Sequence, residues 1–180
     1  MEDAAGTGGE PRIDDFETGL GADDGLELRV WLRLLTCSTL IEHGVRHGLN
    51  RNFATTLPRF DVLAQLQRAG KPLSMGDLSR RLMVTNGNVT GLVDRLAREG
   101  MVERRRAAGD RRVQMVELTA AGAALFARMA ADNRRWVTGM MDGLAREEKE
   151  ALFALLGRLK SAVLESGETM EDADEQDRRR

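Results

Sequence analysis

The hydrophobic positions between residues 73 and 119 predict short helices followed by a pair of strands. Four apolar residues fall at i, i+3, i+4 and i+7, the spacing of one buried helix face, and they are Val89, Leu92, Val93 and Leu96. Upstream, Ser74 and Asp77 have the spacing of a capping box that starts a helix, whose apolar stripe continues to Met83. Two helices separated by residues 84–86 predict a helix-turn-helix, whose second helix can lie in the major groove of DNA.

Residues 101–106 and 112–118 are two short runs with the character of β-strands. They flank Ala107-Ala108-Gly109-Asp110, so the pair predicts a β-hairpin. Helix, turn, helix and hairpin in this order predict a winged helix-turn-helix. The expected fold class is therefore mainly α with a small β-hairpin wing.

Longer apolar patterns predict further helices on both sides of the winged helix. Residues 26–49 are apolar on more than one helix face, which indicates burial on several sides and hence a subunit interface. A polar loop is expected over residues 51–56, before a helix that Pro58 starts and Gly70 stops. A helix from Thr119 to about residue 141 and a last one from about Ala145, with leucines at coiled-coil-like spacing, follow the hairpin. These long helices exceed what so small a core needs, so they predict a homodimer.

The patterns divide the chain into segments with different expected roles. Residues 1–25 form an acidic tail without aliphatic periodicity, which we expect to be disordered. Residues 58–118 are the predicted winged helix-turn-helix, and residues 26–57 and 119–165 the predicted helical dimerisation region. Residues 166–180 are expected to form a charged C-terminal tail.

The net charge of −2 hides a separation of charges along the chain. Residues 1–27 contain nine acidic residues against one arginine, and residues 165–180 seven against three, so residues 28–164 carry a surplus of ten positive charges. Half of that surplus falls within residues 80–112, which contain nine arginines and four acidic residues. A solvated arginine-rich face is the simpler interpretation, but coincidence with a helix-turn-helix favours contact with the phosphates of double-stranded DNA.

The second helix of the motif carries glycines and polar residues on the face opposite its apolar stripe. Gly87 and Gly91 each cost about 1 kcal/mol relative to alanine in a helix interior, which indicates that something approaches the backbone closely. The residues expected to contact DNA are Asn86, Asn88, Thr90, Gly91 and Arg95 of this helix and Arg104, Arg105, Arg106, Arg111 and Arg112 of the hairpin. An ion pair between Asp94 and Arg98 on an ordinary surface helix is the competing interpretation, and it leaves Asn88 and Arg112 unexplained.

Two motifs in this region are specific. One is Asp110-Arg111-Arg112 followed by Leu118-Thr119 and Gly122, and the other is residues 89–96 followed by Gly100. Together they resemble the wing signature and the recognition helix of the MarR family of bacterial transcriptional regulators, and the resemblance covers about residues 26–165. It implies an obligate dimer, a palindromic DNA site, and a pocket between the dimerisation helices and the winged helix, where a small and often aromatic ligand weakens DNA binding. It also implies that Arg112 enters the minor groove and that Asp110 steadies the hairpin.

Residues 31–37, 56–61 and 86–91 further resemble a subgroup that senses aromatic acids or their coenzyme A thioesters. The resemblance implies a small-molecule effector and no cofactor. The candidate ligand contacts are Trp31, Cys37, His43, Arg51, Arg59, Phe60 and Trp136. Aromatic walls with a few polar groups are typical of small-molecule pockets, although aromatic residues belong by default to the core.

Metal and redox sensing are weaker alternatives. His43 and His47 at i, i+4 have the spacing of metal ligands, but two histidines and one cysteine leave a four-ligand site incomplete, so a surface pair is the simpler interpretation. Cys37 has no second cysteine to resolve an oxidised form, and a small residue buried in an apolar helix is the simpler interpretation. A redox- or metal-responsive regulator stays open as an alternative, as does a winged helix that binds a protein.

The sequence gives no indication of an enzyme or of a membrane protein. It contains no phosphate loop, nucleophile elbow, zinc signature or dinucleotide fingerprint. No run approaches 18 apolar residues and the first residues are acidic, so we expect neither a transmembrane helix nor a secretory signal. The single cysteine fits a reducing cytosol. The sequence therefore predicts a cytoplasmic, nucleoid-associated regulator of transcription that acts as a ligand-responsive repressor.

Overall fold

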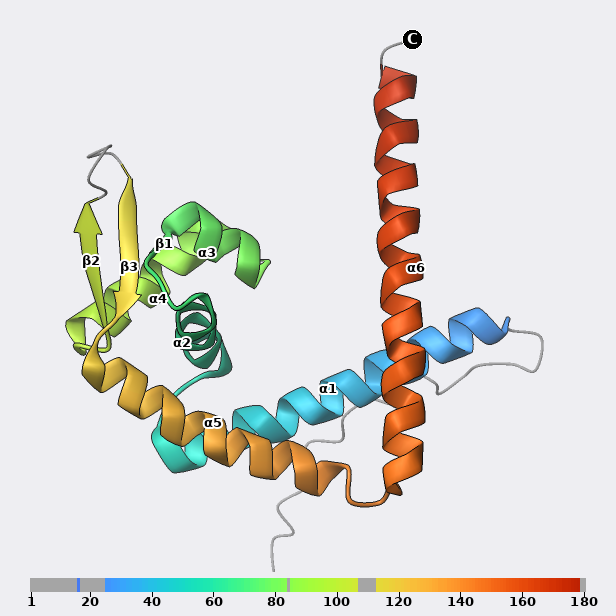
Figure 1. Cartoon of the computed structure of the whole chain (residues 1–180), viewed down its shortest axis with the longest axis horizontal. Helices are drawn as coiled ribbons and strands as arrows, with labels where there is room; N and C mark the ends of the chain where they lie inside the picture. The colour runs from blue at the N-terminus through green and yellow to red at the C-terminus, as the bar shows by residue number, and fades with distance from the viewer. Residues whose placement is uncertain (1–15, 17–24, 84, 107–112, 179–180) are drawn as a thin grey trace, which may run out of the picture. The chain divides into compact units, whose positions relative to one another are not determined.

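The computed structural model describes Phe16 and residues 25–83, 85–106 and 113–178. Within these residues, helices and strands follow one another as α1 (Leu26–Phe53), α2 (Leu57–Ala69), β1 (Leu73–Ser74), α3 (Met75–Leu82), α4 (Asn86–Arg98), β2 (Val102–Arg106), β3 (Gln114–Leu118), α5 (Ala120–Met140) and α6 (Arg146–Arg178) (Figure 1). They form two compact units, Met1–Val137 and Thr138–Arg180. The expected fold class, mainly helical with a small β wing, is confirmed.

The sheet contains one strand more than the expected hairpin. β2 pairs antiparallel with β3, from Val102 opposite Leu118 to Arg106 opposite Gln114. β1 adds to the other edge of β3, where Leu73 lies opposite Val116. The sequence did not predict β1, because a strand of two residues is too short to show an alternating pattern.

The predicted capping box begins α3. Ser74 Oγ accepts a hydrogen bond from the backbone N–H of Asp77 at 3.0 Å and donates one to the Asp77 carboxylate at 2.7 Å. The hydrogen bond from Ser74 to the carboxylate is the main reason why the pKa of Asp77 lies below its usual value. Met83 ends the helix in the left-handed region with a φ of 54°, and α4 begins at Asn86 with Thr85 as its N-cap. The helix-turn-helix is thus present, with residues 83–85 between the helices, one position earlier than expected.

One apolar core holds α4 in place. Val89, Val93 and Leu96 of this helix are at most 1% exposed, as their spacing predicts. The other buried apolar residues come from the C-terminal part of α1, from α2, α3 and all three strands, and from Met129 of α5. Because full burial of such a side chain contributes about 1.5–3 kcal/mol, this stripe fixes the rotation of α4 about its own axis.

α1 packs on the rest of its unit through its C-terminal part. The Trp136 ring of α5 lies on Gly48, where an added Cβ would come within 2.8 Å of the ring. Nearby, Asn52 donates a hydrogen bond to the Asp132 carboxylate at 3.4 Å, and α1 and α5 run side by side at this end (Figure 1). The helix continues to Phe53, so Arg51 lies in its last turn and the expectation of a polar loop from residue 51 is wrong.

The N-terminal half of α1 exposes large apolar side chains. Leu26 is 68% exposed and Trp31 57% exposed, and Cys37 is exposed as well. The expectations that Trp31 belongs to the core and that Cys37 is buried are therefore wrong for the single chain, because its unit packs against the other end of the helix.

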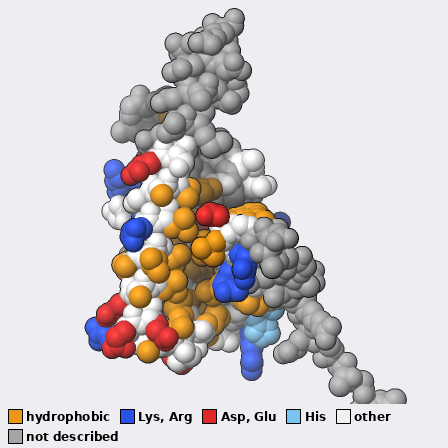
Figure 2. Space-filling model, turned by 90° about the vertical axis from the view of Figure 1, so that its right-hand side faces the viewer, with side chains coloured by type: hydrophobic (Ala, Val, Ile, Leu, Met, Phe, Trp, Pro, Cys, Tyr) orange, Lys and Arg blue, Asp and Glu red, His pale blue; other side chains and the backbone are white. Residues whose placement is uncertain are grey.

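α6 also exposes apolar side chains along its length. The large ones are Leu152, Phe153, Leu155, Leu156, Leu159, Val163 and Leu164. Figure 2 shows hydrophobic side chains exposed in that view, with charged side chains between and around them. The helix continues to Arg178, so residues 166–178 of the expected charged tail are helical.

The junction between the wing and α5 depends on a close backbone contact. Thr119 Oγ1 donates a hydrogen bond to the Gly100 carbonyl at 2.6 Å and accepts one from the N–H of Gly122 at 3.0 Å. A Cβ on Gly122 would lie 1.9 Å from the carbonyl oxygen of Met101. The Leu118-Thr119 and Gly122 part of the motif therefore ties α5 to the turn before β2.

We expect Gly122→Ala to lower the free energy of unfolding by about 3 kcal/mol, because the Met101 carbonyl cannot move away without distorting the turn. Urea unfolding followed by circular dichroism measures the change. Gly139→Ala in α5 is the control, since no described atom outside its own helix lies within 4 Å of the added Cβ, and it should unfold at the parent midpoint or above. Parent-like stability of Gly122→Ala would contradict the close contact.

Candidate nucleic-acid interface

The polar face of α4 is open to solvent. Asn88, Thr90 and Arg95 are exposed there, in agreement with their predicted position. Gly87 and Gly91 are exposed too, and no described atom outside the helix lies within 4 Å of the Cβ that either position lacks. The packing of the chain itself therefore gives no reason for these glycines, which leaves room for a partner to approach the backbone.

The N-terminus of α4 can receive an anion. Thr85 makes no capping hydrogen bond with its side chain, and the first turn contains no acidic residue. The first N–H groups of a helix have no partner within the helix, and the helix dipole favours negative charge beside them. A phosphate group fits this position. Asn86 begins the helix, and its side chain lies outside the described part of the structure.

The three arginines of β2 have different surroundings. Arg104 lies with its Nη1 2.7 Å from Oδ1 of Asp94 on α4, and its side chain is only 26% exposed. Arg105 is 64% exposed and forms ion pairs with two glutamates of the hairpin, while Arg106 is exposed at the end of the strand. Arg106 is therefore the best placed of the three for an outside phosphate.

Arg105 neutralises a pair of like charges within the hairpin. Glu103 and Glu117 stand directly opposite each other in the antiparallel register, an arrangement that is repulsive without a counter-charge. Arg105 Nη2 lies 2.7 Å from Glu103 and its Nε 2.7 Å from Glu117. The hydrogen bond to Glu103, followed by the charges of both glutamates, raises the pKa of Arg105 above its usual value.

The competing interpretation of α4 as an ordinary surface helix predicted an ion pair between Asp94 and Arg98. Instead, Arg98 Nε donates to the backbone carbonyl of Asp94 at 3.4 Å, and the Asp94 carboxylate pairs with Arg104. We did not predict this contact, although strand alternation puts Arg104 on the same face of β2 as the buried Val102. Asp110, Arg111 and Arg112 lie outside the described residues, so their roles stay predictions.

The residues expected to bind an effector do not form one site within the single chain. Trp31 and Arg51 stand near opposite ends of α1, twenty residues apart, or about 30 Å along the helix axis. Phe60 is 9% exposed and packs on Phe126 with 5.5 Å between ring centroids. Arg59 forms an ion pair with Glu99 at the end of α4. The side chains of Arg59 and Phe60 thus already have partners within the protein, as does Trp136 on Gly48.

The histidines and Cys37 are not part of a cluster of metal ligands among the described residues. His43 and His47 are exposed on α1, in line with a surface pair. Among the described residues, no group of three or more His, Cys, Asp or Glu is placed to hold a metal ion. The described helices also include none that is long and apolar enough to cross a membrane.

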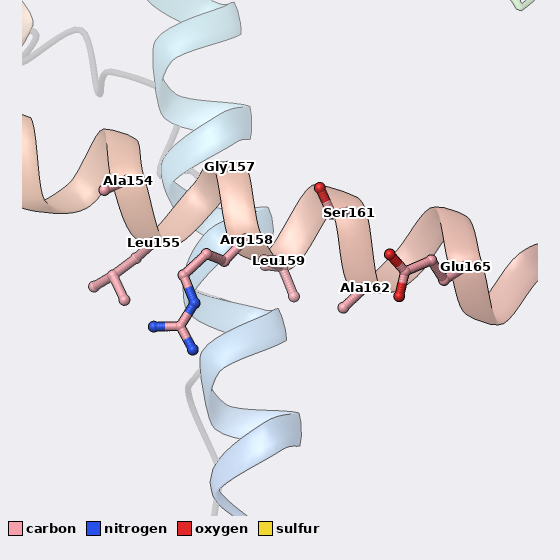
Figure 3. Close-up of a pocket in the computed structure, with 8 residues that line it drawn as sticks. All are labelled: Ala154, Leu155, Gly157, Arg158, Leu159, Ser161, Ala162 and Glu165. Carbon is pink, nitrogen blue, oxygen red and sulfur yellow. The ribbon is translucent and has the colours of Figure 1, made fainter.

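A hollow of about 830 Å³ lies along α6 (Figure 3). Its lining consists of Ala154, Leu155, Gly157, Arg158, Leu159, Ser161, Ala162 and Glu165. All of these residues belong to one helix, and most are small or apolar. The hollow is therefore an uncovered helix face suited to another helix, and it lacks the surrounding walls of a small-molecule pocket.

The fold and this surface define a winged helix-turn-helix protein, with a solvent-facing recognition helix beside an arginine-rich hairpin. The sequence model of the MarR family matches residues 47–113 of this chain. The chain is 32% identical to the HTH-type transcriptional repressor YetL of Bacillus subtilis over 149 residues, which are 79% of this chain and 85% of that protein. It is 35% identical to the HTH-type transcriptional regulator PecS of Dickeya dadantii over 107 residues, 58% of this chain and 64% of that one.

Solved structures show the same fold. Wild-type MarR from E. coli, in its apo form, has a TM-score of 0.66 at 24% identity, with coverage of 77% of this chain and 98% of that one. A mutant of the same protein complexed with operator DNA has a TM-score of 0.64 at 25% identity, with coverage of 76% and 99%. The chain belongs to the MarR family. It is a winged-helix transcriptional regulator and not an enzyme.

We expect Gly91→Ala to raise the stability of the protein and to weaken its binding to DNA. Alanine should raise the free energy of unfolding by up to about 1 kcal/mol, because the site is an open helix interior. The same methyl group should weaken binding to DNA that the parent selects from a random pool, since it keeps the DNA from the backbone. Urea unfolding and fluorescence anisotropy measure the two effects, with Gly139→Ala as the control that leaves DNA affinity unchanged. Unchanged affinity of Gly91→Ala would contradict close approach at this face.

Proposed function

We propose that the protein binds a palindromic operator as a homodimer and represses transcription from it. The observation that carries the proposal is the exposed polar face of α4, where Gly87 and Gly91 leave open space. The uncapped start of the helix and Arg106 at the end of β2 add donors for phosphates. Repression is proposed because YetL, named a transcriptional repressor, matches over most of both chains.

The homodimer is proposed from the uncovered apolar surface. The exposed side chains of α1, such as Leu26 and Trp31, and those of α6, such as Leu155 and Val163, would face water in a monomer. A second copy is the fitting occupant, because two recognition helices about one DNA turn apart, roughly 34–36 Å, can read two half-sites of a palindrome. The neighbour that was solved with operator DNA supports binding of this chain to an operator.

Replacement of Arg112 measures how much the wing contributes to DNA binding. In the proposed complex it enters the minor groove, so Arg112→Ala should weaken binding at every salt concentration and lower the salt slope by about one per subunit. Anisotropy titrations between low and high salt measure the slope, and sedimentation of the complex should give two chains per duplex. Arg146→Ala removes a charge from an 86% exposed side chain on α6 and serves as the control. Parent-like binding by Arg112→Ala, or a well-folded monomer at micromolar concentration, would contradict the proposal.

We further propose that an aromatic carboxylate or its coenzyme A thioester releases the protein from DNA. Trp31 and Arg51 are exposed, so a ligand can contact either one without opening the core. Arginine suits the phosphates of a thioester because its planar guanidinium binds them in a bidentate manner. In one chain the two residues lie too far apart for a small acid to touch both, so joint contact requires the second copy.

The effector proposal predicts graded release. A ligand acts only through its preference for the non-binding state, so operator affinity should fall by about 5- to 150-fold at saturation. The titration compares free aromatic acids, their thioesters, zinc and peroxide. Trp31→Ala should abolish the response to the acids, and Arg51→Ala should weaken the response to thioesters alone. A response only to zinc would favour His43 and His47, a response only to peroxide would favour Cys37, and either result would end the aromatic-ligand proposal.

A further inference from the structure

We propose that Asp94 and Arg104 are positioning residues, whose ion pair fixes the wing strand β2 against the recognition helix α4. The pair would set the distance between the two elements that read DNA. The inference rests on the proposed DNA binding. It also gives Arg104 a role different from the phosphate contact that the sequence predicted.

The Arg104 side chain points toward the interior of the protein. Nη1 lies 2.7 Å from Oδ1 of Asp94, and the side chain of Arg104 is 26% exposed against 48% for that of Asp94. Its Nε and Nη2 are enclosed and have no hydrogen-bond partner among the described residues. Arg104 also stands opposite Val116, which is fully buried, on the core side of the sheet. A guanidinium in this place faces α4, and it does not project toward an outside phosphate.

The charge of Asp94 is what makes this placement stable. A cation that is largely removed from water loses hydration, and a carboxylate at hydrogen-bonding distance offsets that loss. Without Asp94, Arg104 would be an enclosed cation with no such partner, and its side chain would turn outward to regain water. Outward rotation would break the contact between β2 and α4.

The pair lies at the point where the hairpin leaves the core. Burial along β2 falls from Val102, which is 2% exposed, through the half-buried Glu103 and Arg104 to the exposed Arg105 and Arg106. The base of the hairpin is therefore held by apolar packing, whereas the part beyond Arg104 is not. An ion pair at this position limits pivoting of the hairpin about its base. A wing that is already held in place loses less conformational freedom when DNA binds.

Arg105 provides a matched comparison on the same strand. It pairs with Glu103 and Glu117, which are both in the hairpin, so it joins the two strands without joining them to α4. Arg106 is the second comparison, as an exposed arginine that is suited to a phosphate. Each of the three neighbouring arginines thus has a different role. Arg104 positions the wing, Arg105 stabilises the hairpin, and Arg106 is suited to a phosphate.

The first test is DNA binding as a function of salt, with DNA selected by the full-length parent from a random pool. Asp94→Asn should bind about tenfold more weakly, although loss of a negative charge near DNA would by itself strengthen binding. Arg104→Gln should weaken binding to a similar degree with the salt slope of the parent, and the double variant should be no weaker than either single one. Arg106→Gln should instead lower the salt slope by about one per subunit. Asp94→Glu, which keeps the carboxylate, should stay within about threefold of the parent.

The second test does not depend on DNA. Hydrogen exchange of the full chain should be faster in the β2 and β3 amides of Asp94→Asn than in the parent, with α4 amides unchanged. Arg105→Gln, which breaks only ion pairs within the hairpin, should also speed exchange there. Arg146→Gln on α6 is the control, and it should leave hairpin exchange and DNA binding at the parent level. Tighter DNA binding by Asp94→Asn, or a salt slope lowered by one per subunit in Arg104→Gln, overturns the positioning role. If the parent binds no DNA, the proposed function fails, and parent-like hairpin exchange in Asp94→Asn would overturn the positioning role separately.

Discussion

The burial of the apolar stripe of α4 is the constraint on which the rest of the structure depends. Val89, Val93 and Leu96 are almost completely enclosed, so the helix cannot rotate without exposing them. Its opposite face, with Asn88 and Gly91, is therefore held toward solvent. The same core includes residues of all three strands, which places the wing beside the recognition helix. The arrangement that can read DNA is thus a consequence of hydrophobic packing.

Ion pairs within the protein give the three arginines of β2 different surroundings. Arg104 and Arg105 are one position apart on β2, and alternation directs one toward α4 and the other toward the glutamates of the hairpin. Their neighbour Arg106 stands exposed at the strand end. An arginine-rich sequence therefore overstates the number of phosphate contacts, because acidic residues within the fold already pair with two of these three side chains.

The single chain covers some parts of its long helices and leaves other parts exposed. The C-terminal part of α1 packs on α5 through Gly48 and Trp136, whereas its N-terminal half leaves Trp31 exposed. α6 exposes leucines along a face that also contains Gly157 and small neighbours. The described residues of the winged helix pack their core within one chain. Reading a palindrome and responding to a ligand are proposed properties of two chains, since they need surfaces that one chain leaves uncovered.

The sequence by itself determined the features that depend on neighbours along the chain. The stripe of α4, the capping box at Ser74 and the stop at Gly70 are local patterns, and the structure contains all three. Only the tertiary structure decided the partner of Arg104, the contact of Gly122 with the Met101 carbonyl, and the exposure of Trp31. Periodicity specifies which face of an element is apolar, but it does not specify which other element covers that face. Contacts between elements depend on the relative positions of whole backbones, and these are fixed only when the core has packed.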